Sequence, residues 1–238
     1  FYSLTVLAAG LFGKPAFKNC IVSGIVLAED GRKMSKSLRN YTDPMLVVEK
    51  YGADALRFAL MNSSIVRADD LKFSDDLVKD AIKDLMLPLW NAYSFFVTYA
   101  NIDGYEPSST PFDKLSNSLD RWIISDLNKL IKDVTASYDS YDVQSICTSL
   151  VSFMDDLNNW YIRRSRRRFW KSENDGDKKE AYDTLYRVLL TFTKVAAPMG
   201  PFISDEIYQN LSKGELKESV HLEDYPVYNS EERDEKLE

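Results

Sequence analysis

The chain has 238 residues, 45% apolar and 28% charged, with a formal net charge of −7, which is typical of a globular protein and excludes fibrous and disordered classes. Its widely separated cysteines, Cys20 and Cys147, and its single histidine, His221, favour a reducing cytoplasmic location and predict no bound metal site. The apolar runs are too short to span a bilayer, so no membrane partner is expected.

The first 40 residues predict a small α/β unit. Residues 2–12 form an apolar segment that favours a helix, and residues 20–27 are rich in β-branched side chains that favour a buried strand. A helix that leads into a buried strand is half of a parallel α/β unit, and phosphate ligands bind such sheets outside the carboxyl ends of the strands. A polar loop follows this strand.

That loop carries two lysines three positions apart. Each ammonium group is a compact charge on a flexible stem, so the pair can follow phosphate oxygens while negative charge builds up on departing pyrophosphate. Serine residues lie on both sides of the second lysine. The candidate phosphate-binding residues are Lys33, Met34, Ser35, Lys36 and Ser37, with Lys33 and Lys36 as the candidate catalytic pair.

Residues 41–74 predict a short helical connection. Asp43 caps a helix that starts at Pro44, and a second helix runs over residues 54–61. On that second helix Asp54 and Arg57 either brace the lysine loop or form an ordinary surface pair.

A helical bundle is predicted from residue 75 onward, because the apolar period stays near 3.6. Its core stripe includes Trp122, Ile123, Leu127, Leu130, Ile131 and Val134. The segment around His221 alternates like a short strand, and an acidic, mobile end is expected beyond residue 229. The predicted helices cover residues 75–100 with a kink before Pro88, 119–138, 143–170, 178–197 and 202–211.

Five arginines occupy six positions between residues 163 and 168. At about 100° per residue, most of them share one arc of a helix, with Trp160 at its boundary as a stacking platform. The alternative is a solvated face whose arginines pair with Asp155, Asp156, Glu173 or the acidic end. The candidate RNA-binding residues are Trp160, Arg163, Arg164, Arg167, Arg168 and Lys171.

The order of these motifs resembles the class I aminoacyl-tRNA synthetases. The lysine loop follows a strand, Tyr51-Gly52-Ala53-Asp54-Ala55-Leu56-Arg57 comes next, and an all-helical region follows. Two stretches of sequence, residues 25–32 before the lysines and residues 159–170, are similar to isoleucyl-tRNA synthetases of the eukaryotic cytoplasmic type. Valyl and leucyl enzymes, or a non-catalytic helical RNA-binding or scaffold protein, are the alternatives.

The resemblance implies a mainly α fold. Residues 1–40 would be the end of a Rossmann-type catalytic domain, residues 41–74 a connection, and residues 75–238 an anticodon-binding bundle with an acidic tail. Lys33 and Lys36 would bind ATP phosphates, with Mg²⁺, as isoleucine becomes an adenylate, and the bundle would present tRNA(Ile).

The family's second signature, His-Ile-Gly-His, is missing from this chain, whose one histidine cannot supply two. The resemblance would place that signature upstream, together with the isoleucine pocket. We therefore expect an internal fragment of an isoleucine-tRNA ligase that is inactive alone.

Overall fold

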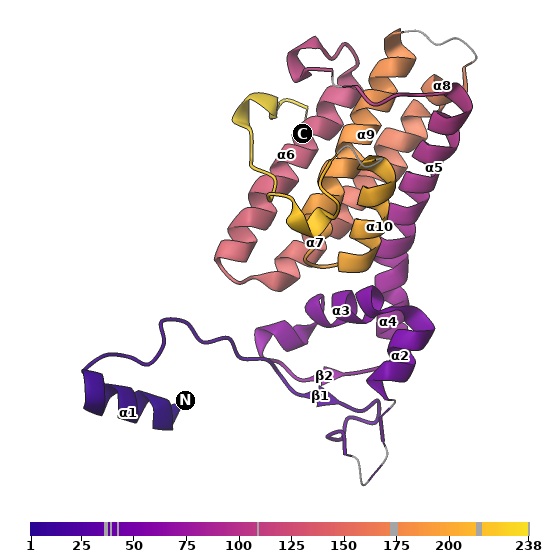
Figure 1. Ribbon diagram of the computed structural model, residues 1–238. Helices are drawn as coiled ribbons and strands as arrows, with labels where there is room; N and C mark the ends of the chain where they lie inside the picture. Colours follow the sequence, from indigo (N-terminus) through magenta and orange to yellow (C-terminus); the bar gives the residue numbers. More distant parts are fainter. Residues whose placement is uncertain are drawn as a thin grey trace.

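The computed structural model describes residues 1–35, 38, 40–41, 43–108, 110–171, 176–212 and 216–237. Figure 1 shows long helices packed side by side, a smaller part below them that holds two short strands, and helix α1 (Tyr2–Phe12) lying apart from both. The predicted mainly helical fold with a small sheet is confirmed. Helix α1 matches its predicted range, although none of its residues is buried.

Two strands, β1 (Val26–Leu27) and β2 (Leu71–Lys72), pair in parallel, with Val26 opposite Leu71 and Leu27 opposite Lys72. The predicted buried strand over residues 20–27 is wrong in extent, because Ile21 and Val22 are 73% and 51% exposed. β-Branched residues favour an extended backbone, but a strand also needs a partner, and β2 offers only two residues. Strand β2 was not predicted, because it is too short to show a period.

Gly24 brings the chain before β1 against the segment before β2. Its amide donates to the carbonyl oxygen of Ile65, and a Cβ atom built on it would lie 1.8 Å from the carbonyl oxygen of Asp69. Beyond it, the Leu71 amide donates to the Ile25 carbonyl. A side chain at position 24 therefore cannot fit without moving the backbone of one segment.

We expect Gly24→Ala to destabilise this sheet by about 1–3 kcal/mol, the usual cost of overpacking. Hydrogen exchange at the Leu71 and Phe73 amides, which donate across the sheet, measures the effect locally. Gly10→Ala is the matched control, since nothing lies within 4 Å of a Cβ atom at Gly10. Unchanged protection of both amides in Gly24→Ala would contradict the expectation.

Three helices cover the sheet and join it to the bundle. Asp43 caps α2 (Pro44–Tyr51) by accepting a hydrogen bond from the Met45 amide, as predicted, and Gly52 at φ 88° turns the chain into α3 (Ala53–Met61). The 3₁₀ turn η1 (Ser64–Arg67) leads to β2, and α4 (Asp75–Ala81) follows.

Asp54 and Arg57 of α3 bind neither the lysine loop nor each other in the described contacts. The Asp54 carboxylate accepts hydrogen bonds from the amides of Phe202 (3.3 Å) and Ile203 (2.7 Å), and Arg57 Nε donates to the carbonyl oxygen of Pro198 at 2.9 Å. Both alternatives weighed from the sequence are therefore replaced by a tie between α3 and the start of the last long helix, together with the turn that precedes it.

The bundle follows the predicted helices closely, and its two longest predicted helices each contain a π-helical turn. Pro88 has no amide hydrogen and its ring crowds the carbonyl four residues before it, so the helix widens into a π-helical turn just ahead of it. The elements are η2 (Ile82–Met86, π), α5 (Leu87–Asp103), the 3₁₀ turn η3 (Phe112–Lys114), α6 (Ser118–Asp139), α7 (Val143–Asp155), η4 (Asp156–Ile162, π), α8 (Arg163–Trp170), α9 (Gly176–Ala196) and α10 (Pro201–Ser212).

Apolar faces of these helices form the core. Five of the six residues of the predicted α6 stripe are buried, and Trp122 is half-buried at its edge. Phe153 of α7 stacks on Phe192 of α9 with ring centroids 5.5 Å apart. The periodicity therefore predicted the buried faces correctly.

The acidic end is held on the bundle, in contrast to the expected mobile tail. Glu232, in the 3₁₀ turn η6 (Ser230–Glu232), pairs with Arg187 of α9 at 2.6 Å, and Asp234 pairs with Arg121 of α6 at 2.9 Å. The segment predicted as a short strand is the 3₁₀ turn η5 (Val220–Leu222), with His221 exposed.

Candidate functional site

The lysine loop begins in a tight turn that follows β1. The Ala28 amide donates to the carbonyl oxygen of Arg32 at 2.9 Å, and the Gly31 amide donates to that of Ala28 at 2.8 Å. Gly31 has φ 78°, a left-handed conformation that glycine adopts at low cost. Asp30 pairs with Arg32 at 2.6 Å across the turn, and Arg32 holds the pKa of the Asp30 carboxyl below its usual value.

Lys33 lies at the end of this turn, where it forms an antiparallel bridge with Leu27 and leaves its side chain exposed. Asn40 closes the loop, because its side chain accepts a hydrogen bond from the Ser35 amide at 2.9 Å and donates to the carbonyl oxygen of Lys33 at 3.2 Å. Met34 is half-buried. Lys36 and Ser37, the other predicted loop residues, lie outside the described residues.

Asn40 is not among the predicted loop residues. The only available signal was an asparagine shortly after the two lysines, and asparagine commonly hydrogen-bonds to nearby backbone. Its two contacts fix the spacing between Lys33 and Ser35.

Helix α8 presents an exposed arginine face. Trp160 in η4 is 51% exposed, and the guanidinium carbon of Arg164 lies 5.2 Å from its ring centroid, one helical turn away. Arg163 and Arg167 are also exposed, and no ion pair engages Arg163, Arg164 or Arg167 within the described part of the chain. These three cations and one indole ring are therefore free to meet a polyanion. We name these four residues the arginine face.

Arg168 does not belong to that face. Its guanidinium group is buried and forms a bidentate pair with Asp120 of α6, with both N–O distances at 2.7 Å. Tyr161 donates a hydrogen bond to the same carboxylate, also at 2.7 Å. Helical spacing correctly predicted that Arg168 lies on the same arc as its neighbouring arginines. Its guanidinium group nevertheless points into the core, where it pairs with the carboxylate of Asp120.

Lys171 is partly engaged as well. It pairs with Asp177 at 2.9 Å, and Asp177 also lies 2.7 Å from Arg168 Nε as an ion pair that is poorly aligned for a hydrogen bond. Burial opposes the charge on Arg168, but its hydrogen bonds to Asp120 outweigh burial and raise the guanidinium pKa above its usual value. Burial likewise acts against Asp177, but Lys171 and Arg168 prevail and lower its pKa.

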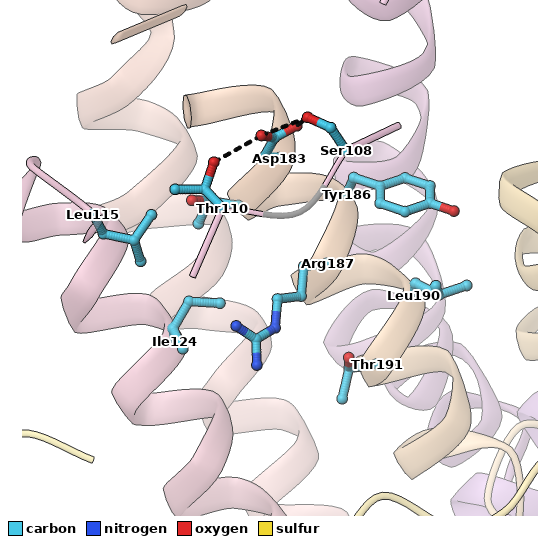
Figure 2. A pocket seen from close by; sticks show the side chains of 10 residues that line it. Ser108, Thr110, Leu115, Ile124, Asp183, Tyr186, Arg187, Leu190 and Thr191 are labelled. Carbon is cyan, nitrogen blue, oxygen red and sulfur yellow. Dashed lines mark hydrogen bonds between the residues drawn. The ribbon is translucent and has the colours of Figure 1, made fainter. Parts of the chain in front are cut away.

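A cavity of about 190 Å³ lies between α9 and the segment that connects α5 to α6 (Figure 2). At one end the buried carboxylate of Asp183 accepts hydrogen bonds from the hydroxyls of Ser108 and Thr110, and Tyr105 donates to it as well. Arg187 lines the other side and pairs with Glu232. Because these charged groups are satisfied by the chain itself, the cavity is not a candidate site.

In the described residues, no group of three or more His, Cys, Asp or Glu side chains is placed to hold a metal ion. The helices that the structure describes include none that is long and apolar enough to cross a membrane.

Two segments of the chain match families of known proteins. The anticodon-binding domain of tRNA ligase matches residues 120–238, and the class I tRNA synthetases (I, L, M and V) match residues 1–73. The chain therefore belongs to the class I tRNA ligases that carry this anticodon-binding domain.

Its relatives at high identity are isoleucine-tRNA ligases. The chain is 57% identical to that of Treponema denticola, 54% to that of Treponema pallidum and 51% to that of Protochlamydia amoebophila. Each alignment covers all of this chain but only 23% of the relative, so the chain spans about a quarter of their length. These relatives are bacterial, and the expected likeness to the eukaryotic cytoplasmic type finds no support in them.

Two solved structures share the fold at 23% identity. The leucyl enzyme of Agrobacterium radiobacter K84, in a ternary complex with tRNA and LeuAMS, matches 97% of this chain and 27% of its own with a TM-score of 0.75. The methionyl-tRNA synthetase of Mycobacterium tuberculosis, in complex with methionyl-adenylate, matches 76% of this chain and 36% of its own with a TM-score of 0.62.

Proposed function

We propose that this chain is part of an isoleucine-tRNA ligase, in which it supplies the lysine loop of the ATP site and the helices that hold tRNA(Ile). The observation that carries the proposal is the 57% identity, over the whole chain, to a relative of that name. We assign residues 1–40 to the catalytic domain, 41–74 to the connection and 75–238 to the tRNA-binding bundle.

In the reaction, a carboxylate oxygen of isoleucine attacks the α-phosphorus of ATP. The bond from that phosphorus to the β-phosphate oxygen breaks, and pyrophosphate leaves with the electron pair. Lys33 and Lys36 bind the phosphates and stabilise the charge that grows on the leaving group, and Mg²⁺ accompanies the nucleotide. In this proposal Ser35 and Ser37 set the conformation of the loop, and Met34 packs the loop against the rest of the protein.

Pyrophosphate exchange tests this proposal. The full-length protein should exchange pyrophosphate into ATP far faster with isoleucine than with valine or leucine. The same comparison distinguishes an isoleucyl enzyme from the valyl and leucyl alternatives. The 238-residue chain alone should show no exchange, because the isoleucine pocket is assigned to other residues. Rapid exchange by the chain alone, or a preference for another amino acid, would overturn the proposal.

The arginine face is our proposed contact with tRNA phosphates. Arg168 is left out because its guanidinium is committed to Asp120, and Lys171 contributes at the edge while paired with Asp177. Trp160 offers a ring on which an unstacked base can lie.

Arg164→Gln should weaken tRNA binding and flatten its salt dependence. Each phosphate contact contributes about 0.7–0.9 to the slope of log K against log salt concentration, so the slope should fall by about that amount. Fluorescence titrations of the full-length protein with tRNA(Ile) at several salt concentrations measure it. Lys79→Gln is the matched control, because Lys79 is exposed on α4 and already pairs with Asp76. An unchanged slope in Arg164→Gln would remove Arg164 from the interface.

A further inference from the structure

The short sheet places a lysine that the lysine loop does not contain beside that loop. Lys72 of β2 pairs with Leu27 of β1, and Leu27 forms its second bridge with Lys33. Directly paired residues on neighbouring strands project from the same face of a sheet. Lys33, Leu27 and Lys72 therefore form one row, with the two lysine backbones two strand spacings, or about 10 Å, apart.

This row lies on the outer face of the sheet. The neighbouring residues, Leu71 in β2 and Ala28 directly after β1, are buried, whereas both lysines are exposed. The outer face therefore presents one ammonium group on each side of Leu27.

The side chain of Lys72 extends over the turn that leads into the loop. A methyl group built on Gly31 would lie 3.2 Å from Cε and 3.6 Å from Nζ of Lys72. The missing side chain at Gly31 thus leaves room for the lysine stem, and the ammonium group comes to rest beside the turn.

No carboxylate of the described residues holds the Lys72 ammonium group in this position. Within the turn, Asp30 is itself held by Arg32 through two side-chain contacts at 2.6 and 2.7 Å. Within the described part of the chain, the Lys72 ammonium group has neither an ion-pair nor a hydrogen-bond partner. A lysine aimed at a phosphate loop without a carboxylate of its own has the chemistry of an anion contact.

We propose that Lys72 is a further phosphate-binding lysine of the ATP site, which acts with Lys33 on the β- and γ-phosphates. The inference rests on the proposed function and adds to the lysine loop a residue that is distant from it in the sequence. A contact of this kind raises affinity for ATP and for pyrophosphate but not for AMP, which lacks those phosphates.

Calorimetric binding of ATP and AMP to the full-length protein tests the proposal. Lys72→Met should weaken ATP binding about tenfold and leave AMP binding unchanged, as expected for loss of one hydrogen bond to a charged group. Lys72→Arg, which keeps the charge, should restore ATP binding to within about threefold of the wild type. In pyrophosphate exchange, the KM for pyrophosphate should rise in Lys72→Met.

Lys79→Met is the matched control, an exposed lysine on the neighbouring helix α4, and Lys72→Gln is a second neutral variant. Equal losses of ATP and AMP affinity in Lys72→Met would indicate a structural role and overturn the inference. Wild-type ATP binding in Lys72→Met, with pyrophosphate exchange slowed in Lys36→Ala, would overturn the inference alone. Wild-type ATP binding in Lys72→Met together with a wild-type exchange rate in Lys36→Ala would overturn the proposed function of the loop as well.

Discussion

Replacing Asp120 by alanine is expected to destabilise the helical bundle by about 3–5 kcal/mol, the usual cost of removing one partner of a buried ion pair. Asp120 has no exposed surface and accepts hydrogen bonds from Arg168 and Tyr161. Its removal leaves the Arg168 guanidinium charged and largely buried, since the side chain of Arg168 is 10% exposed. Urea unfolding of the 238-residue chain, followed by circular dichroism, measures the loss.

Asp80→Ala provides the control for this prediction. Asp80 pairs with Lys83 at 3.2 Å, but both side chains are more than 60% exposed. Exposed pairs of this kind contribute about 0–1 kcal/mol. If Asp120→Ala unfolded at the same urea concentration as Asp80→Ala, the buried pair would not be a major source of stability.

Lys36→Ala is expected to slow isoleucine-dependent pyrophosphate exchange by the full-length protein by about 10²–10³-fold, the range seen when one group that stabilises transition-state charge is removed. Under the proposed function, the charge that Lys36 meets grows as pyrophosphate leaves, so its loss should lower the rate. The KM for isoleucine should change little, because the proposal assigns amino-acid binding to other residues.

Lys14→Ala serves as the control for Lys36→Ala, since Lys14 is an exposed lysine of the same part of the chain. It should exchange pyrophosphate at the wild-type rate. A Lys36→Ala enzyme with an unchanged rate but a raised KM for isoleucine would assign the lysine to amino-acid binding instead.

The helices could be predicted from the sequence because their signals are local. Apolar residues recur every three to four positions along α6 and α9, and Asp43 before Pro44 marks the start of α2. The strands could not be predicted with the right extent, because a two-residue strand has no period and its existence depends on a partner 45 residues away.

The candidate sites likewise include features with a local sequence signal and features that depend on a distant partner. The lysine loop and the exposed arginines are visible in the sequence as clusters of one charge. The withdrawal of Arg168 is not visible, because its partner, Asp120, lies 48 residues earlier on another helix. The anchored acidic end follows the same rule, since Glu232 and Asp234 depend on Arg187 and Arg121 of helices that are distant in sequence.

The tie between α3 and α10 bears on attempts to exchange parts between tRNA ligases. Helix α10 begins after Gly200, which has no side chain to accept a hydrogen bond from the first free amides of the helix. Asp54 fills that role from outside the bundle by accepting from Phe202 and Ile203. A bundle grafted from residue 75 onward would leave this cap behind, so a working chimera must carry α3 and α10 together as a matched pair.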